Sequence, residues 1–524
     1  MPAIKVLYYN WVDFEDGEQR GGGVSVYQRN LINAALRRGD DVWFLSSGTH
    51  HSPLSRRPFV REVRGKVGVR KFELVNSAVL APGQFAFGQD AASAPAMEAV
   101  FLDFLRRHGP FDVVHFNNLE GVPVSFLRVA REHDAQARVV VSAHNYFAFC
   151  PQVNLWFQER ATCSDFRGGK KCANCLVRPV NVKGARRLYQ TEYALGQLGI
   201  RFGTPLFRLL NGAIHGPVRA AFRAVKAALG LEVEATPGQR TEGPPKEPVT
   251  PAVLLDADTA ARFAARRRLF VEAINTYADH FLAVSRRVAE LAAGFGIDPA
   301  KLRTLYIGTR FAEREAPAGA GSLSRKRIKA GPLRVAYLGY MRRDKGFYFY
   351  LTALRKMPPG LARRLSLVFA AQVVDAHAYA LVKRMAHRFA GVTFYDGYTH
   401  GQVPEILAGV DLGVVPVLWE DNLPQVAIEC VASGVPVLTS DRGGARELLD
   451  CPALVFKAGS RADLYARLRA VLDDPDLLQS AVAGRMRLYT PDEHYDRLRR
   501  EVYRGAAPAE EAAPAAAALY TTSP

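Results

Sequence analysis

Short apolar runs rich in β-forming residues alternate with helical patterns along most of this 524-residue chain. Ile4–Tyr9 is such a run, and Val24–Arg38 follows it with apolar residues at helical spacing. Strands that alternate with helices favour parallel pairing and a doubly wound sheet. The chain exceeds what one hydrophobic core usually supports, so we expect an α/β protein with at least two such domains. Further strands of the first half are expected at Val42–Leu45, Asp112–Phe116, Val139–Ser142, Phe281–Val284 and Arg303–Ile307.

The second half repeats the rhythm more regularly, with helical patterns between successive apolar runs. Gly319–Lys329 is small, polar and basic, as a connection between the two halves would be. Strands are expected at Arg334–Leu338, Ser366–Phe369, Val392–Tyr395, Leu412–Pro416, Val435–Thr439 and Ala453–Phe456.

Two kinds of segment stand outside this scheme. One is an insert in the first domain, which contains a cysteine cluster and then the basic, helical stretch Lys183–Leu229. The other kind is rich in Pro, Glu, Thr, Ala or Gly and is predicted to be disordered. The expected parts are a first domain at 1–317 with its insert at about 150–280 and a disordered loop at about 232–252, a second domain at 331–490, a C-terminal helix at 491–505 and a disordered tail at 506–524.

The formal charge of +18 suits an anionic partner. No zinc-finger spacing or RNP-type signature is present, so a nucleic-acid partner is not expected. Arginines alternate with apolar residues through Val182–Leu229, as in a basic amphipathic surface helix, although such a helix can also pack on its own domain. No apolar run is long enough to cross a bilayer, and Met1–Lys5 leads directly into a strand. We therefore expect a cytoplasmic protein in peripheral contact with the inner face of the cell membrane.

A polar turn lies between an expected strand and an expected helix at Trp419–Glu429. The carboxyl edge of a parallel sheet is where such folds bind ligands. Asp421 and Glu429 can present carboxylates to hydroxyls, and the backbone amides of Leu423, Gln425 and Val426 can hold phosphate at a helix N-terminus. A capped surface turn, with Asp421 or Asn422 as the N-cap, explains the same spacing equally well.

The residues that follow favour the ligand site. Ser433–Leu438 reads Ser-Gly-Val-Pro-Val-Leu, and Asp441–Glu447 reads Asp-Arg-Gly-Gly-Ala-Arg-Glu. With the acidic pair, this run resembles the family 4 glycosyltransferases, which are retaining enzymes of group 1 type. The resemblance implies the GT-B fold: two Rossmann-like doubly wound domains that face each other across a cleft. It further implies that Asp421 contacts the donor sugar and Glu429 the donor ribose, with Asn422, Gly443 and Gly444 in the same site. The first acid is usually Glu in that family, so Asp421, with its shorter arm, departs from the pattern.

Tyr337–Gly346 matches the family's strand–Gly–loop–Lys-Gly element, whose Arg and Lys bind the donor diphosphate. Lys345 falls on the Lys. The usual Arg position holds Tyr340, so we expect Arg342 or Arg343 to supply the guanidinium. Cations there would neutralise the charge that builds on the departing diphosphate. A solvated basic turn is the alternative.

Three elements of the first half also resemble the family. Gly21-Gly22-Gly23 looks like its glycine loop, and glycines let backbone approach a ligand, so Gly22 and Gly23 are candidate donor contacts. Phe111–Asn118 and Val140–Asn145 resemble its two strand-end histidine loops. His144 is therefore a candidate catalytic residue beside Asp421, Glu429 and Lys345. The remaining candidates, His115 and Asn145, would lie on the acceptor side, and a structural role for either histidine stays open.

Four of the six cysteines form the pattern Cys150-x12-Cys163-x8-Cys172-x2-Cys175. Four thiolates suit a tetrahedral zinc ion, and some family members carry a similar insert. We expect a structural zinc site here. An iron–sulfur cluster and unligated buried cysteines are the alternatives.

The resemblance implies transfer of a sugar from a nucleoside diphosphate sugar to an acceptor hydroxyl with retention of configuration. We expect a lipid-linked glycan or a polysaccharide precursor as acceptor, as in cell-envelope polysaccharide biosynthesis. No Asp-x-Asp motif follows a strand, since Asp256-Ala-Asp258 lies in the insert, so no catalytic divalent metal is expected. A catalytically inactive nucleotide-sugar- or lipid-binding scaffold of the same fold is the main alternative. A phosphorylase would need a pyridoxal-phosphate lysine site that the sequence does not display.

Overall fold

The computed structural model describes residues 2–16, 20–86, 91–176, 181–200, 202–215, 257–313 and 331–505. The chain divides into two compact units. Unit 1 comprises Met1–Val153, Asp165–Phe281 and Phe295–Lys301, and unit 2 comprises Asn154–Ser164, Leu282–Gly294 and Leu302–Pro524. The predicted disordered loop, the predicted connection at 319–329 and the predicted tail lie outside the described residues.

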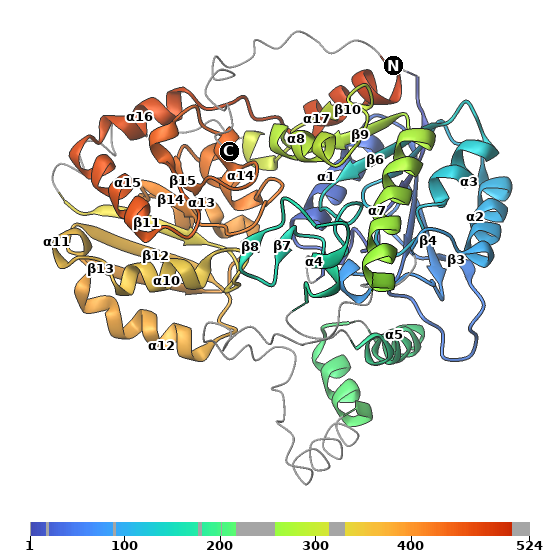
Figure 1. The fold of residues 1–524 in the computed structure, drawn as a ribbon, viewed down its shortest axis with the longest axis horizontal. Helices are drawn as coiled ribbons and strands as arrows, with labels where there is room; N and C mark the ends of the chain where they lie inside the picture. The colour runs from blue at the N-terminus through green and yellow to red at the C-terminus, as the bar shows by residue number, and fades with distance from the viewer. Residues whose placement is uncertain are drawn as a thin grey trace. The chain divides into compact units, whose positions relative to one another are not determined.

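The first sheet has eight strands in the order β10-β9-β6-β5-β1-β2-β4-β3. Figure 1 labels β10, β9, β6, β4 and β3 of this sheet. β1 pairs in parallel with both β2 and β5, and the edge strand β3 is antiparallel to its neighbour β4. The strands are β1 (Lys5–Tyr9), β2 (Asp41–Ser47), β3 (Phe59–Val63), β4 (Val69–Val75), β5 (Val113–Phe116), β6 (Arg138–Ala143), β9 (His280–Ala283) and β10 (Leu302–Thr304).

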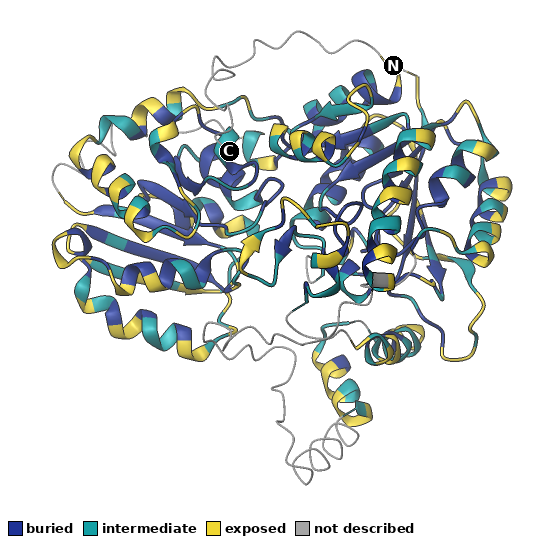
Figure 2. Cartoon of the chain, viewed as in Figure 1, coloured by how far each residue is buried: buried dark blue, intermediate teal, exposed yellow. Residues whose placement is uncertain are grey.

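Helices connect these strands in the manner that the alternating pattern predicts. They are α1 (Gly23–Arg37), η1 (Gly83–Ala86), α2 (Pro95–His108), α3 (Phe126–His133), α7 (Ala257–Tyr277) and α8 (Arg286–Gly294). The central strand β5 is completely buried, and β1 is buried except at Lys5. The helices α2 and α3 carry exposed residues on their outer faces (Figure 2). α3 begins only at Phe126, because Pro123 and the turn that follows it interrupt the helical spacing of apolar residues over Val122–His133.

The second sheet has six strands in the order β13-β12-β11-β14-β15-β16, and every adjacent pair is parallel. The strands are β11 (Leu333–Leu338), β12 (Leu365–Ala371), β13 (Gly391–Asp396), β14 (Leu412–Val415), β15 (Val437–Ser440) and β16 (Val455–Phe456). The α-helices of this unit are α10 (Phe347–Arg355), α11 (Pro359–Ala362), α12 (Ala376–Met385), α13 (Val403–Leu407), α14 (Gln425–Ala432), α15 (Arg461–Asp473), α16 (Asp476–Ala483) and α17 (Pro491–Arg497).

Several short helices complete this unit. They are η2 (Arg310–Glu313), η3 (Ala386–Arg388), η4 (His400–Gln402), η5 (Ala445–Glu447), η6 (Pro452–Leu454) and the π-helix η7 (Leu498–Tyr503), which continues α17.

β3 and β4 were not expected from the sequence. Their charged residues hide the strand pattern, since Arg61, Lys71 and Glu73 all lie within them. Lys71 is nevertheless buried, because Asp13 and Glu15 pair with its ammonium. A charged side chain that has such partners can occupy a buried strand position.

In its described residues the insert is less helical than expected, and the part of the expected helical stretch from 216 to 229 lies outside them. Its cysteine-containing part forms the short strands β7 (Trp156–Phe157) and β8 (Ala161–Thr162) and the single turn α4 (Lys170–Ala173). The expected continuous helical stretch is broken after α5 (Val182–Gln197) and resumes at 205–215. Gly199 and Gly203 both have positive φ in the break, a conformation that ends helices. In the part of the chain that the structure describes, no helix is long and apolar enough to cross a bilayer.

Candidate functional site

The order of the second sheet reverses between β11 and β14, and such a switch point is where open α/β sheets bind ligands. Lys345 lies in the loop after β11 and Asp421 in the turn after β14. Lys345 Nζ donates a hydrogen bond to Asp421 Oδ2 at 2.6 Å. The same ammonium lies 5.4 Å from the centroid of the Trp419 ring. Two residues that are 76 positions apart in the sequence therefore meet at the expected edge.

The backbone after β11 fits closely against the end of β14. Gly346 has a φ of +74°, and a β-carbon there would lie 1.7 Å from the carbonyl oxygen of Pro416. The Leu418 amide also donates to the Asp344 carbonyl at 3.0 Å. No side chain fits at Gly346, so this glycine fixes where Lys345 stands.

The two arginines of this loop have different partners. Arg342 binds the Asp344 carboxylate, with Nε donating to Oδ1 at 3.0 Å. Burial lowers the pKa of Arg342, but Asp344 and, more weakly, Asp421 raise it, and the net shift is upward. Arg343 instead lies 3.6 Å from Glu159. Arg342 is thus the arginine within electrostatic reach of the Lys345–Asp421 pair.

The predicted donor glycines Gly443 and Gly444 support the acidic turn. Gly443 has a φ of +69°, and a β-carbon there would lie 1.9 Å from the Asp421 carbonyl oxygen. The Gly444 amide donates to that oxygen at 2.9 Å. Ser285 Oγ donates to the Asn422 carbonyl at 2.8 Å. These contacts are made with the backbone of the turn, so its shape depends on both glycines.

Glu420 is fully buried beside the turn. Its carboxylate accepts hydrogen bonds from the Arg287 guanidinium at 3.1 Å and from the Gly443 amide at 3.0 Å. Burial alone would raise the pKa of Glu420, but Arg287, the Gly443 amide and Arg442 lower it below its ordinary value. Glu420 is therefore an ionised structural group, and Asp421 is the acid that meets Lys345.

Glu447, the last residue of the Asp441–Glu447 run, caps a helix. Its carboxylate accepts from the amides of Arg286 and Arg287 at 2.9 and 2.8 Å, at the start of α8. Tyr306 Oη donates to it at 2.6 Å. A carboxylate at a helix N-terminus satisfies amides that lack partners within the helix.

Glu429 lies on α14 and is almost completely buried. His400 Nδ1 lies 2.8 Å from Glu429 Oε1. Of the predicted amide donors, Leu423 is buried just before α14, and Gln425 and Val426 are half-buried in its first turn. Glu429 and Asp421 thus have separate basic partners.

The first sheet has its own switch point between β1 and β5. Gly22 precedes α1 with a φ of +51°, and Gly23 is the first residue of that helix. The ring of Tyr27 on α1 lies 4.5 Å from the ring of His144, measured between centroids. The structure therefore places the glycine loop and the second histidine loop side by side.

The first histidine has a different environment. His115 is completely buried on β5, and its Nε2 lies 2.7 Å from Ser142 Oγ. This burial favours the structural role for His115. Asn145 is partly exposed, and its side-chain amide donates to the Glu120 carboxylate, while its Oδ1 accepts from the Phe147 amide at 3.0 Å.

Glu120 is a buried acid that the sequence reasoning did not single out. It follows β5 closely, and its carboxylate accepts from the backbone amide of Gly83 and from the side chains of Asn145 and Trp11. Burial raises the pKa of Glu120 to about 7, although these three donors act in the opposite direction. Its position two residues after the strand-end run 111–118 was the available signal.

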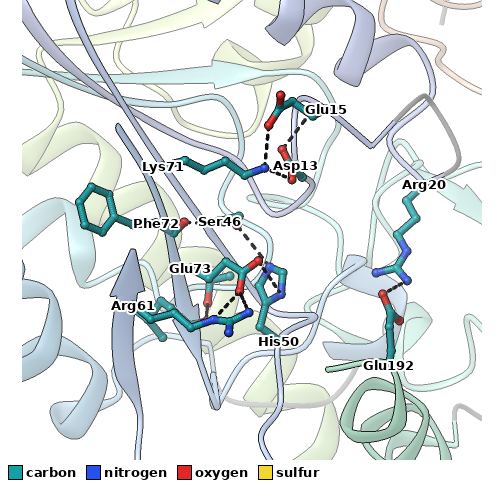
Figure 3. Close-up of polar contacts among 12 residues, drawn as sticks. Asp13, Glu15, Arg20, Ser46, His50, Arg61, Lys71, Phe72, Glu73 and Glu192 are labelled. Carbon is teal, nitrogen blue, oxygen red and sulfur yellow. Dashed lines mark hydrogen bonds and ion pairs between the residues drawn. The ribbon is translucent and has the colours of Figure 1, made fainter. Parts of the chain in front are cut away.

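Unit 1 also carries a network of charged side chains near β2, β3 and β4 (Figure 3). Each acid in the network has a basic partner, so the charges largely neutralise one another. The pairs are Lys71 with Asp13 and Glu15, Glu73 with Arg61 and His50, and Arg20 with Glu192 of α5. The last pair joins the segment before the glycine loop to the insert.

The predicted zinc site at Cys150, Cys163, Cys172 and Cys175 is not supported. All four side chains are buried, but no group of three or more His, Cys, Asp or Glu among the described residues is arranged to hold a metal ion. Cys175 Sγ donates a hydrogen bond to Gln152 Oε1 at 2.8 Å, as a protonated thiol does. Metal binding would require the thiolate.

The fold and the placement of these side chains define a class. Two sheets whose central strands are parallel, each with a switch point bordered by loops that carry polar residues, make up the GT-B architecture. In the second sheet that edge carries a lysine, two acids and a helix N-terminus, a combination suited to a phosphorylated sugar ligand.

The comparisons with known proteins agree with this class. Residues 332–474 match the family model described as "Glycosyl transferases group 1". The chain is 30% identical over 170 residues to the glycogen synthase of Mycobacterium tuberculosis, a match that covers 31% of this chain and 40% of that protein. The match thus spans less than half of the curated relative.

Two solved structures resemble nearly the whole chain. Sucrose-phosphate synthase from Thermosynechococcus elongatus has a TM-score of 0.50 at 14% identity, covering 95% of this chain and 96% of that one. An α,α-trehalose-phosphate synthase from Burkholderia xenovorans has a TM-score of 0.52 at 12% identity, covering 95% and 100%. The expected resemblance to GT-B glycosyltransferases is therefore confirmed. Assignment to family 4 stays a prediction.

Proposed function

We propose that this chain is a retaining glycosyltransferase that moves a sugar from a nucleoside diphosphate sugar to an acceptor hydroxyl. The observation that carries the proposal is the Lys345–Asp421 ion pair at the β11–β14 switch point, inside the segment that matches the group 1 family. The nucleotide-sugar chemistry also fits the relatives: the trehalose-phosphate synthase of similar fold is described as UDP-forming.

In this proposal the leaving diphosphate is stabilised by protein groups, with no divalent metal. Lys345 and Arg342 supply two positive charges, and the N-terminus of α14 supplies backbone dipoles. Asp421 accepts hydrogen bonds from donor-sugar hydroxyls and Glu429 from the ribose. In unit 1, Gly22, Gly23, His144 and Asn145 stay as predicted donor- and acceptor-side contacts.

Donor binding then exchanges one set of partners for another. In the ligand-free chain the Lys345 ammonium neutralises Asp421, whose side chain is 8% exposed. A diphosphate that draws Lys345 away leaves a buried carboxylate in need of hydrogen-bond donors. Sugar hydroxyls supply these hydrogen bonds to Asp421. The intact nucleoside diphosphate sugar is therefore expected to bind more tightly than the nucleoside diphosphate alone. This difference favours product release after transfer.

The test is turnover across a panel of nucleoside diphosphate sugars, followed as release of the nucleoside diphosphate with chelator present. We expect one or more donors to be consumed, and the double variant Lys345→Ala/Glu429→Ala to lose at least about a hundredfold in kcat/KM. The anomeric configuration of the product, read by NMR, tests retention.

A matched control is the double variant Lys356→Ala/Glu405→Ala, which removes the same two charges from exposed positions of the same unit. It should keep wild-type turnover. Wild-type turnover in the Lys345→Ala/Glu429→Ala protein would refute the assigned site. Donor binding without turnover across the panel would favour the inactive scaffold instead.

We further propose that the acceptor is a lipid-linked glycan or polysaccharide precursor and that the insert contacts an anionic membrane surface. Four of the large apolar side chains most exposed in the described residues lie in the insert: Leu198, Leu206, Leu209 and Ile214, between 50% and 75% exposed. Exposed cations accompany them at Lys183, Arg186, Arg187 and Arg208. Apolar side chains beside cations are the composition that binds anionic bilayers.

Co-sedimentation with vesicles tests this surface. The vesicles consist of phosphatidylcholine, either alone or with about one third of the anionic lipid phosphatidylglycerol. Wild type should sediment with the anionic vesicles and not with phosphatidylcholine alone. Arg186→Glu/Arg187→Glu should abolish sedimentation, because each basic residue near the surface adds about 1 kcal/mol. The control Arg106→Glu/Arg107→Glu reverses an exposed arginine pair on α2 and should still sediment. If both variants lose sedimentation equally, binding depends on the net charge of the protein, and the proposed surface is refuted.

A further inference from the structure

The Glu429 carboxylate is almost completely enclosed by the protein. Its side chain is 2% exposed. Oε2 is buried and has no hydrogen-bond partner among the described residues, while Oε1 is 2.8 Å from His400 Nδ1. The His400 side chain is 35% exposed, so of the two partners the imidazole is the one in contact with solvent.

His400 stands on a separate element from Glu429. It begins η4, directly after Thr399, whose side chain caps that short helix together with Gln402. The capping box holds the backbone of η4, whereas the imidazole extends from it to α14. A side-chain rotation can therefore break the His400–Glu429 bond without moving either element.

We propose that His400 is a displaceable cover on Glu429, and that the ribose of a bound nucleoside replaces the imidazole as the hydrogen-bond partner of this carboxylate. The inference rests on the proposed function, in which Glu429 is the ribose contact. A buried carboxylate needs a partner whether or not a ligand is present. His400 fills that need in the ligand-free chain and competes with the ribose.

The experiment is isothermal titration of wild type and His400→Ala with UDP, GDP and ADP. Removing a competing hydrogen bond to a charged group should tighten the Kd of whichever nucleotides bind by about tenfold. The matching 2′,3′-dideoxynucleoside diphosphate has no ribose hydroxyls to replace the imidazole. Its Kd should be the same for both proteins.

Three variants make the result specific. His400→Asn keeps a side-chain donor and should bind like wild type, which also shows that loss of the ring alone has no effect. His377→Ala removes an exposed histidine from α12 and should change nothing. The Kd of the His400→Ala/Glu429→Gln protein should equal that of Glu429→Gln alone, without the tenfold gain in affinity.

Two outcomes overturn the inference. One is an unchanged or weaker ribonucleotide Kd in His400→Ala, because a cover must compete with the ligand. The other is an equal gain for the dideoxy analogue, because the effect would then be independent of the ribose. If neither wild type nor His400→Ala binds any of the three nucleotides, the proposed function itself fails.

Discussion

Replacing Glu120 by Gln should change how the stability of unit 1 depends on pH. The carboxylate is buried, and burial raises its pKa from the ordinary 4.5 to about 7. Below pH 4.5 the acid is protonated in both the folded and the unfolded chain, and its stability contribution is fully present. As the pH rises toward 7, the unfolded chain ionises freely while the folded chain still holds the proton. That contribution is therefore lost as the pH rises through this window.

The size of the effect follows from the two pKa values. A difference of about 2.5 units corresponds to about 3 kcal/mol of unfolding free energy, lost between about pH 4.5 and about pH 7. Gln has no proton to lose, so the Glu120→Gln protein lacks this slope. The unfolding free energy of the variant minus that of wild type should therefore increase by about 3 kcal/mol between pH 4 and pH 8. This increase is expected whether the variant is more or less stable than wild type at pH 4.

Urea unfolding at several pH values measures this difference, with tryptophan fluorescence as the signal. Trp11, which donates a hydrogen bond to Glu120 itself, and Trp43 lie in unit 1, whereas Trp156 and Trp419 lie in unit 2. Both proteins are therefore compared in a Trp156→Phe/Trp419→Phe background, in which the signal reports on unit 1. Glu132→Gln removes an exposed carboxylate from α3 and serves as the control, with the wild-type pH dependence expected. Parallel stability curves for wild type and Glu120→Gln across this range would refute the reasoning.

Two further predictions concern the backbone of the site and the insert. Gly443→Ala should destabilise unit 2 by at least about 2 kcal/mol in urea unfolding, because φ is +69° and the new β-carbon would lie 1.9 Å from the Asp421 carbonyl oxygen. Gly459→Ala, with φ +77° and no atom within 4 Å of the new β-carbon, should cost only about 1 kcal/mol, and equal costs would contradict the steric argument. Tyr189→Phe removes a buried hydrogen bond of 2.6 Å to the Ala81 carbonyl. It should speed hydrogen exchange in α5 while α1 keeps the wild-type rate, and unchanged exchange in α5 would show that this bond does not hold the insert.

The alternating pattern predicted the second sheet closely, because its inner strands β11, β12, β14 and β15 are almost completely buried and consist mainly of apolar residues. β11 was expected at Arg334–Leu338 and is observed at Leu333–Leu338. β4 was missed because Lys71 breaks its apolar run, and the acids that neutralise this lysine come from the loop after β1. A pairing between distant segments leaves no local trace in the sequence.

The candidate site shows the same limit at the level of single residues. The family pattern identified Asp421, Lys345 and Glu429 by position, and the fold gives each a distinct partner. The pattern could not separate residues that face a ligand from residues that shape the backbone. Gly443 and Glu447 match it equally well, yet one packs on the turn that carries Asp421 and the other caps α8.

This difference has a physical origin. A ligand contact and a buried backbone contact both restrict a position to one residue type, so both appear as a fixed letter in a motif. Only the surroundings distinguish them, namely whether open space or another backbone meets the side chain. Gly339 illustrates the point, because its φ of +137° also calls for glycine, but the nearest atom to an added β-carbon is the Tyr337 hydroxyl at 3.8 Å. Of the glycines flanking the Lys345 loop, Gly339 is therefore the one with room for a ligand beside it, and Gly346 is the one that positions the lysine.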